Sequence, residues 1–390
     1  MTLPGNSMVC LWLTIAMLVS GCSLNTVQVS GGEEIESQTV QLQDSLLLDV
    51  GVLLFDEGEI TPEQEEESIH EDVRAAEARY MAYHLKETLQ HAYGWGAIRV
   101  LPAASHIADV IVRATIITSN GETLVLRAHV SDSTGTLWFD RKYKAELTEH
   151  DYIDIQPGDD VYQHVYNRIA NDIYRHRKKL ATRQLLRIRN TSELRYAASI
   201  SPDPFSGYLV WLPNGQVQLA RLPAKNDPML QRVRKIRERD YLFVDTINEH
   251  YANFHSVMHW PYTNWRRYYL LELQQKRAIE RRANRTKLAA TAIMIVGLLR
   301  DYPGVVTTGA MLYKDGIDIA REAQIHDDAI RELGDSLKAE VKPLVLDIQG
   351  RTVEIRGTLE EQYRQWRELL REIYLQETGP PADKTLQDSI

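Results

Sequence analysis

Cysteine is scarce in this 390-residue sequence, which contains only Cys10 and Cys22. Because both cysteines precede residue 23, the rest of the chain has no thiol for an internal disulfide, a cysteine nucleophile or a thiolate metal site. Positive charge does not predominate either. The formal net charge is −9, whereas nucleic-acid binding favours a basic surface. We therefore predict no nucleic-acid partner.

A long hydrophobic run is also lacking near the N-terminus. The apolar run at residues 8–19 has about twelve residues, whereas a membrane-spanning helix needs about twenty. This length is typical of the apolar core of a secretory signal peptide. No Lys or Arg precedes the run, which departs from the usual signal-peptide pattern.

The apolar run ends in an aliphatic residue, two small residues and a cysteine, which are Val19, Ser20, Gly21 and Cys22. This ending resembles the lipobox of bacterial lipoproteins. The resemblance implies a signal peptide over residues 1–21, cleavage between Gly21 and Cys22, and acylation of Cys22 with diacylglycerol and a palmitate-type chain. Ser23 rather than Asp follows, which in this family implies sorting to the outer membrane. Several acyl chains anchor a protein durably without a spanning helix. The alternative is an ordinary signal peptide with an incidental cysteine.

Hydrophobic periodicity predicts an α+β protein that begins with a polar, flexible tether over residues 22–45. An α/β domain follows over residues 46–190 with the order β-α-β-β-β-β-α. Its predicted elements are a strand at 46–55, a helix at 68–92, a strand at 97–102, a three-stranded meander at 108–147 and a helix at 159–187. Asn120-Gly121 predicts a tight hairpin turn with positive φ, and Thr134-Gly135 marks a second turn.

Three short patterns in this segment resemble the periplasmic domain of the curli secretion lipoprotein, the TolB N-terminal domain and lipoproteins that activate peptidoglycan synthases. The matching residues are Val52-Leu53-Leu54-Phe55, Ala108-Asp109-Val110, and Asp132, Thr134, Gly135 and Trp138. Leu54 stands where the family has proline, and Ala114-Thr115 where it has glycine. The resemblance covers about residues 46–180 and implies an architecture rather than an activity.

Residues 191–378 are predicted to form a mainly helical domain with small β-hairpins. Pro213-Asn214-Gly215 predicts the turn of the first hairpin. Pro261 predicts a break between two long helices, at 227–260 and 263–299. The remaining predicted elements are a helix at 316–339, a hairpin at 344–357, an amphipathic helix at 358–376 and a disordered tail at 379–390.

His255 and His259 are the candidate metal ligands of the sequence. Their i, i+4 spacing places both imidazoles on one helix face, as a zinc site requires. Ser256 stands where the zincin motif has its glutamate, and the spacing fixes no third ligand. We therefore interpret the pair as a packed or solvated histidine face, and we predict no metal, no cofactor and no catalytic residue.

A basic, tyrosine-rich stretch at 266–287 precedes an apolar run at 288–299. The apolar residues offer a possible membrane or oligomer contact, and they are Ile293, Ile295, Val296, Leu298 and Leu299. The run is too short to span a membrane. A buried core helix explains the same residues and is the interpretation that we favour.

These observations predict a non-enzymatic lipoprotein on the periplasmic face of the outer membrane. We expect it to act as a scaffold or assembly factor of an envelope complex, held by its N-terminal acyl anchor. An envelope protein is the expected partner, and a homo-oligomer is possible. Three alternatives stay open: a component of an oligomeric secretion channel, a regulator of a cell-wall synthase, and a hydrolase of envelope polymers that uses paired carboxylates.

Overall fold

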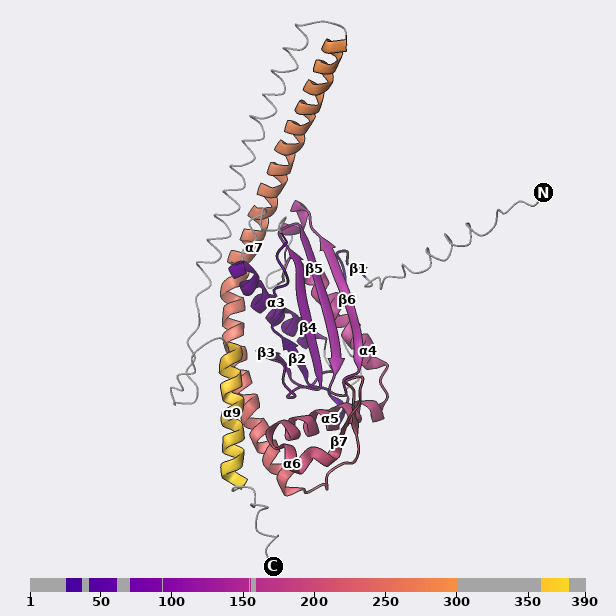
Figure 1. The fold of residues 1–390 in the computed structure, drawn as a ribbon, viewed down its shortest axis with the longest axis vertical. Coiled ribbons are helices and arrows are strands. Elements are labelled where there is room, and N and C mark those ends of the chain that lie inside the picture. The colour runs from indigo at the N-terminus through magenta and orange to yellow at the C-terminus, as the bar shows by residue number, and fades with distance from the viewer. Residues whose placement is uncertain are drawn as a thin grey trace, which may run out of the picture.

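The computed structural model describes residues 26–36, 42–61, 71–92, 94–153, 155, 159–299 and 359–378. These residues form an α+β fold with one six-stranded mixed sheet of order β1-β6-β5-β4-β2-β3 (Figure 1). The strands are β1 (Thr26–Gln28), β2 (Val50–Leu53), β3 (Ile98–Leu101), β4 (Val110–Ser119), β5 (Thr123–Asp132) and β6 (Leu137–Glu146). The helices are α3 (Glu71–His91), α4 (Gln163–Lys178), α5 (Thr182–Ile200), α6 (Pro202–Phe205), α7 (Pro228–Leu299) and α9 (Leu359–Thr378). Short 3₁₀ helices lie at η1 (Asp44–Leu46), η2 (Glu149–Tyr152) and η3 (Ser206–Tyr208).

The predicted order β-α-β-β-β-β-α is present as β2, α3, β3, β4, β5, β6 and α4. Strand β2 pairs in parallel with β3 and β4, and β4, β5 and β6 form the predicted antiparallel meander. Burial alternates along β5, where Leu124, Leu126, Ala128 and Val130 are buried between less buried neighbours. The alternation shows that one face of the sheet is covered. On this face, α3 packs against β2 and β3, and α4 packs against β6.

Both predicted turns of the meander are formed, but Gly121 in the first turn is needed for a reason other than the predicted positive φ. The side-chain Oδ1 of Asn120 accepts hydrogen bonds from the backbone N–H groups of Glu122 and Thr123, at 2.9 and 2.7 Å. Gly121 does not have positive φ, so that expectation is wrong. A Cβ atom on Gly121 would lie 2.1 Å from the carbonyl oxygen of Arg266, so the glycine is needed because α7 passes close by. Gly135 in the second turn has a φ of 78°.

The predicted flexible tether is wrong for residues 26–36. Thr26, Val27 and Gln28 pair in parallel with residues 142–144 of β6 and extend the edge of the sheet. Val29 then donates a backbone hydrogen bond to Lys144 at 2.8 Å and is itself buried. Three residues without a marked apolar pattern become a strand here because an open sheet edge supplies the hydrogen-bonding partners.

The predicted helix at 159–187 is two helices. Helix α4 ends at Lys178 after a basic last turn, which suits the negative end of a helix dipole. Ala181 is extended, and its backbone N–H donates to Oε1 of Gln184 at 2.8 Å, which caps the start of α5. The predicted domain boundary after residue 190 therefore falls inside α5.

The predicted break at Pro261 is also wrong, because α7 runs continuously from Pro228 to Leu299. Proline inside a helix costs about 3 kcal/mol through its missing N–H and a steric clash. Met258, Tyr262 and Trp265 flank it, and at most 4% of each is exposed. Burial of such side chains contributes about 1.5–3 kcal/mol each, which is enough to hold the helix through the proline.

The buried side chains of both predicted domains form one continuous hydrophobic cluster. Helix α7 packs on α3, β3, α5 and α9, and the ring of Phe243 stacks on Trp366 of α9 at 4.6 Å. The predicted hairpin around Pro213 is formed by β7 (Leu209–Trp211) and β8 (Val217–Leu219), with Gly215 at a φ of 80°. The predicted helix at 316–339, hairpin at 344–357 and tail at 379–390 lie outside the described residues.

Candidate functional site

The sequence-predicted site residues are distributed unevenly over the structure. Gly21 and Cys22 lie outside the described residues, which begin at Thr26. His255 and His259 lie together on α7. The five candidate contact residues, Ile293, Ile295, Val296, Leu298 and Leu299, belong to the last turns of α7, and their side chains lie outside the description. Within the described residues, no helix has the length and apolarity needed to cross a membrane.

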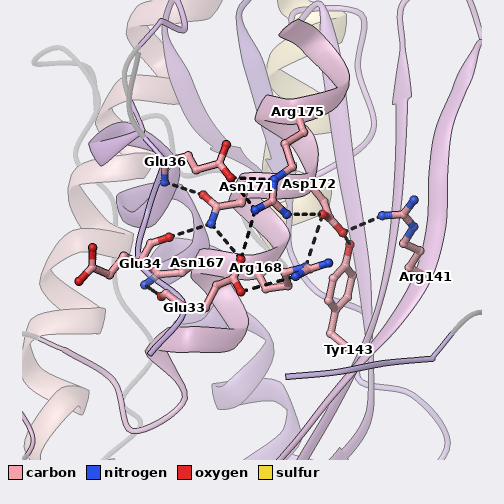
Figure 2. A network of polar contacts seen from close by, with 10 residues as sticks. All are labelled: Glu33, Glu34, Glu36, Arg141, Tyr143, Asn167, Arg168, Asn171, Asp172 and Arg175. Atoms are coloured by element: carbon pink, nitrogen blue, oxygen red, sulfur yellow. Dashed lines mark hydrogen bonds and ion pairs between the residues drawn. The ribbon is translucent and has the colours of Figure 1, made fainter. Parts of the chain in front are cut away.

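Polar contacts fasten residues 33–36 to helix α4, and we call this set the N-terminal clamp (Figure 2). Asn171 donates from Nδ2 to the carbonyl oxygen of Glu34 at 2.8 Å and to Oε1 of Glu33 at 3.2 Å. Its Oδ1 accepts the backbone N–H of Glu36 at 2.7 Å. Arg175 donates from Nε to the Glu36 carboxylate at 2.8 Å. The buried amide of Asn171 therefore makes three hydrogen bonds to residues 33–36, and ion pairs of Arg175 flank it.

A buried carboxylate connects the N-terminal clamp to the sheet. Asp172 of α4, whose side chain is 4% exposed, accepts hydrogen bonds from Arg141 at 2.8 Å and from the hydroxyl of Tyr143 at 2.9 Å, both on β6. Its other oxygen lies 3.5 Å from Arg168 and 3.4 Å from Arg175 (Figure 2). Burial beside this carboxylate raises the pKa of Tyr143, which stays a neutral donor. Residues 33–36 are thus joined to α4 and β6 by one network.

The two candidate metal ligands belong to a partly buried cluster of aromatic rings between α3 and α7. His84 on α3 makes two hydrogen bonds: its Nδ1 lies 3.0 Å from Nε2 of His255, and its Nε2 lies 2.6 Å from Oε1 of Gln163. Tyr80 bonds Nδ1 of His259 through its hydroxyl at 2.9 Å, and its ring stacks on His255 at 4.5 Å. Burial, with a further contribution from His84, lowers the pKa of His255 to about 3. The His255 imidazole is therefore neutral near pH 7, and it packs in the α3–α7 interface.

No group of three metal-binding side chains is placed around a common point in the part of the chain that the structure describes. His255 and His259 instead contact Tyr80 and His84, and the ring centroids of His255 and His259 are 6.1 Å apart. The described contacts of both histidines are thus with neighbouring rings.

A fully buried ion pair lies beside this cluster, and nothing in the sequence pattern indicated it. Arg266 of α7 donates from Nη1 to both carboxylate oxygens of Asp160, at 2.8 and 3.0 Å, and neither side chain is exposed. Burial alone would raise the pKa of Asp160, but the facing guanidinium of Arg266 lowers it to about 2. The same guanidinium donates to the hydroxyl of Tyr262 at 2.6 Å, and that hydroxyl bonds the buried Glu77 carboxylate. The network joins α3, α7 and the segment just before α4 through residues far apart in the sequence.

Asp49 and Asp109, at the starts of β2 and β4, line a cavity of about 300 Å³ together with Glu193 of α5 and with Arg237 and Tyr241 of α7. Burial and the nearby Asp49 raise the pKa of Asp109 to about 6. Both carboxylates already accept backbone N–H groups: Asp109 from Asp49 at 2.9 Å, and Asp49 from Ala97 at 2.8 Å. We interpret them as groups that hold the ends of β2, β3 and β4 in register.

A second cavity, of about 400 Å³, lies between α9, the end of α5 and the loop that joins β3 to β4, and we call it the arginine pocket. Most of the charged side chains that line the arginine pocket belong to helix α9. The lining residues are Ala103, Ala104, Ser105, His106, Ser199, Tyr363, Arg364, Arg367, Glu368 and Arg371. The sequence predicted the helix that carries the arginines, but the loop and α5 complete the cavity only in the folded chain.

Comparison with known proteins leaves these sites to be interpreted from their own geometry. The chain matches no protein-family model, no curated protein and no solved structure. The fold itself is that of a mixed α+β protein with a mixed sheet and several helices.

Proposed function

We propose that the protein is a non-enzymatic lipoprotein, acylated at Cys22, that faces the periplasm from the outer membrane and serves as a scaffold or assembly factor of an envelope complex. The observation that carries this proposal is the N-terminal clamp. Ser23, Leu24 and Asn25 alone separate Cys22 from strand β1. A chain of four residues spans at most about 14 Å, so an acyl anchor at Cys22 would hold the sheet directly at the membrane surface.

The clamp suits a lipid-anchored protein because it resists pulling at the N-terminus. Force applied through the anchor would act first on the β1–β6 pairing and then on Asn171 and the ion pairs of Glu33 and Glu36. Partly exposed ion pairs contribute only about 0.2–1 kcal/mol each, but here they share the buried Asp172 and form a network.

The proposed family resemblance concerns the part of the fold from β2 to α4. Its element order is the order that the resemblance implies, and the hydrogen bonds of the matching turn support it. Asp132 accepts the N–H of Thr134 at 2.8 Å and the indole N–H of Trp138 at 2.9 Å, and Gly135 has positive φ. We therefore propose an N-terminal domain like that of the curli secretion and TolB group, followed by a mainly helical part.

Helix α7 supports the proposed scaffold role because it reaches well beyond the sheet (Figure 1). Arg277 forms an ion pair with Glu122 at the β4–β5 turn. The helix then continues to Leu299, which adds about 22 residues or about 33 Å. We call residues 278–299 the arm, and we propose that its apolar end contacts an envelope protein or a second copy of this chain.

The anchor is tested by metabolic labelling with a palmitate analogue followed by membrane fractionation. The wild type should be labelled and should sediment with the outer membrane, whereas Cys22→Ala should lose the label. Cys10→Ala is the matched control, because Cys10 would be removed with the signal peptide and should change nothing. An unlabelled wild type, or equal labelling of Cys22→Ala, would exclude the lipoprotein.

A further inference from the structure

The arginine pocket combines a concave shape with unequal charge. Arg364, Arg367 and Arg371 stand at i, i+3 and i+7 of α9, a spacing that places them on one face of the helix. Among the described residues that line the cavity, Glu368 is the only carboxylate. Ser105 and His106 approach from the loop between β3 and β4.

The central arginine is fixed in place by the protein. Arg367 donates from Nη1 to the Asp240 carboxylate at 2.5 Å and from Nη2 to the hydroxyl of Ser199 at 2.7 Å. Its guanidinium lies 4.6 Å from the ring centre of Tyr196, and its side chain is 12% exposed. Because Asp240 neutralises it, Arg367 shapes the wall of the pocket rather than adding net charge.

Among the residues that the structure describes, no group occupies all the hydrogen-bond donors of the two outer arginines. Arg371 donates from Nε to the carbonyl oxygen of Ser199 at 3.0 Å, which orients the guanidinium and leaves its terminal nitrogens available. Arg364 makes no hydrogen bond or ion pair with any residue that the structure describes. Neither arginine is paired with Glu368 within that part of the chain. Two guanidinium groups thus face one cavity with one carboxylate between them.

His106 contributes polarity without charge. Burial, together with the positive charges of Arg195 and Arg367, lowers its pKa to about 4. Near pH 7 the imidazole is therefore neutral, and it can donate or accept one hydrogen bond. Because Asp240 neutralises Arg367, the remaining charged groups are the two positive guanidinium groups of Arg364 and Arg371 and the negative carboxylate of Glu368. The pocket therefore has one net positive charge.

We propose that the arginine pocket binds a phosphate ester, whose phosphate oxygens accept hydrogen bonds from Arg364 and Arg371. A phosphate group is tetrahedral rather than planar, so its non-ester oxygens point in different directions and two guanidinium groups can bind it together. The single net charge matches a phosphodiester. A cavity of about 400 Å³ lies in the range of sites for organic ligands and exceeds what a bare phosphate fills. The inference is independent of the acylation of Cys22.

Calorimetric titration of the full-length protein in a neutral maltoside detergent tests the proposal, with glycerophosphoglycerol as the phosphodiester probe and glycerol as the blank. We expect saturable binding of the diester, and at least tenfold weaker binding by Arg364→Gln/Arg371→Gln, since each charge-assisted hydrogen bond carries a large share of the affinity. Glu368→Gln should bind more tightly. Arg285→Gln, an exposed arginine of the arm, is the matched control and should bind like the wild type.

Phosphatidylglycerol added to the detergent micelles distinguishes the two sources of such a group. If it competes with the soluble diester and phosphatidylcholine does not, the pocket takes a lipid headgroup; if neither competes, the ligand is a soluble ester. Circular dichroism of each variant confirms that it is folded. The proposal is overturned if the wild type shows no binding at millimolar diester, or if the double variant binds as tightly as the wild type.

Discussion

Replacement of Asp160 by Asn would leave the guanidinium of Arg266 charged and unpaired inside the protein. Neither side chain is exposed, and the two oxygens of Asp160 are the carboxylate partners of Arg266. Removal of one partner of a buried ion pair destabilises a protein by about 3–5 kcal/mol, because the remaining charge is not solvated. The Oδ1 atom of the asparagine can still accept the backbone N–H of Tyr162, so the substitution removes the negative charge and keeps this hydrogen bond.

Urea unfolding followed by circular dichroism would measure the change in the free energy of unfolding. The double variant Asp160→Asn/Arg266→Met removes both charges and should recover most of the loss, because apolar replacement of a buried pair is often neutral. Asp245→Asn is the matched control, since Asp245 pairs with Arg99 while 49% exposed, and should cost at most about 1 kcal/mol. A loss below about 1 kcal/mol for Asp160→Asn alone would refute the reasoning.

Three further predictions concern the clamp, the ring cluster and the turn under α7. Asn171→Ala should speed hydrogen exchange of the residues 26–28 amides while the free energy of unfolding falls by only about 1–3 kcal/mol, and unchanged exchange would contradict the clamp. The pKa of His255 is about 3 in the folded protein and about 6.5 in the unfolded chain, so the unfolded chain binds the proton first as pH falls. The free energy of unfolding therefore decreases as pH falls from 6.5 toward 3. In urea unfolding at pH 7 and 4.5, His255→Phe should lose less of this free energy between the two pH values than the wild type. Gly121→Ala should lower the melting temperature by several degrees because its Cβ meets backbone at 2.1 Å, whereas Gly31→Ala, with nothing within 4 Å, should leave it unchanged.

The fold class and the order from β2 to α4 were predictable because their signals are local. Alternating apolar residues such as Leu126 and Val130 and the Asn120-Gly121 turn lie within a few residues of one another. Strand β1 was missed because it is defined by the free edge of β6, about 115 residues further along the chain. The continuity of α7 was missed because its proline is offset by packing that only the folded chain provides.

The sites were harder to predict than the fold. Asp160 and Arg266 are 106 residues apart, so no spacing rule connects them. The helical spacing of Arg364 and Arg371 is visible in the sequence, but an exposed face and a pocket wall have the same pattern until the loop at 103–106 is placed. The i, i+4 spacing of His255 and His259 identified a shared helix face, and only the structure supplied its neighbours Tyr80 and His84.

The central claim, that a lipid-anchored scaffold holds an envelope complex together, is tested most directly by the mass and composition of the complex extracted from the outer membrane in mild detergent. The proposal predicts this chain together with a distinct envelope protein, and loss of that protein when Ile295 and Leu299 of the arm are changed to Asp. A large closed homo-oligomer would favour the secretion-channel alternative. A lone monomer, with nothing bound to it, would contradict the scaffold.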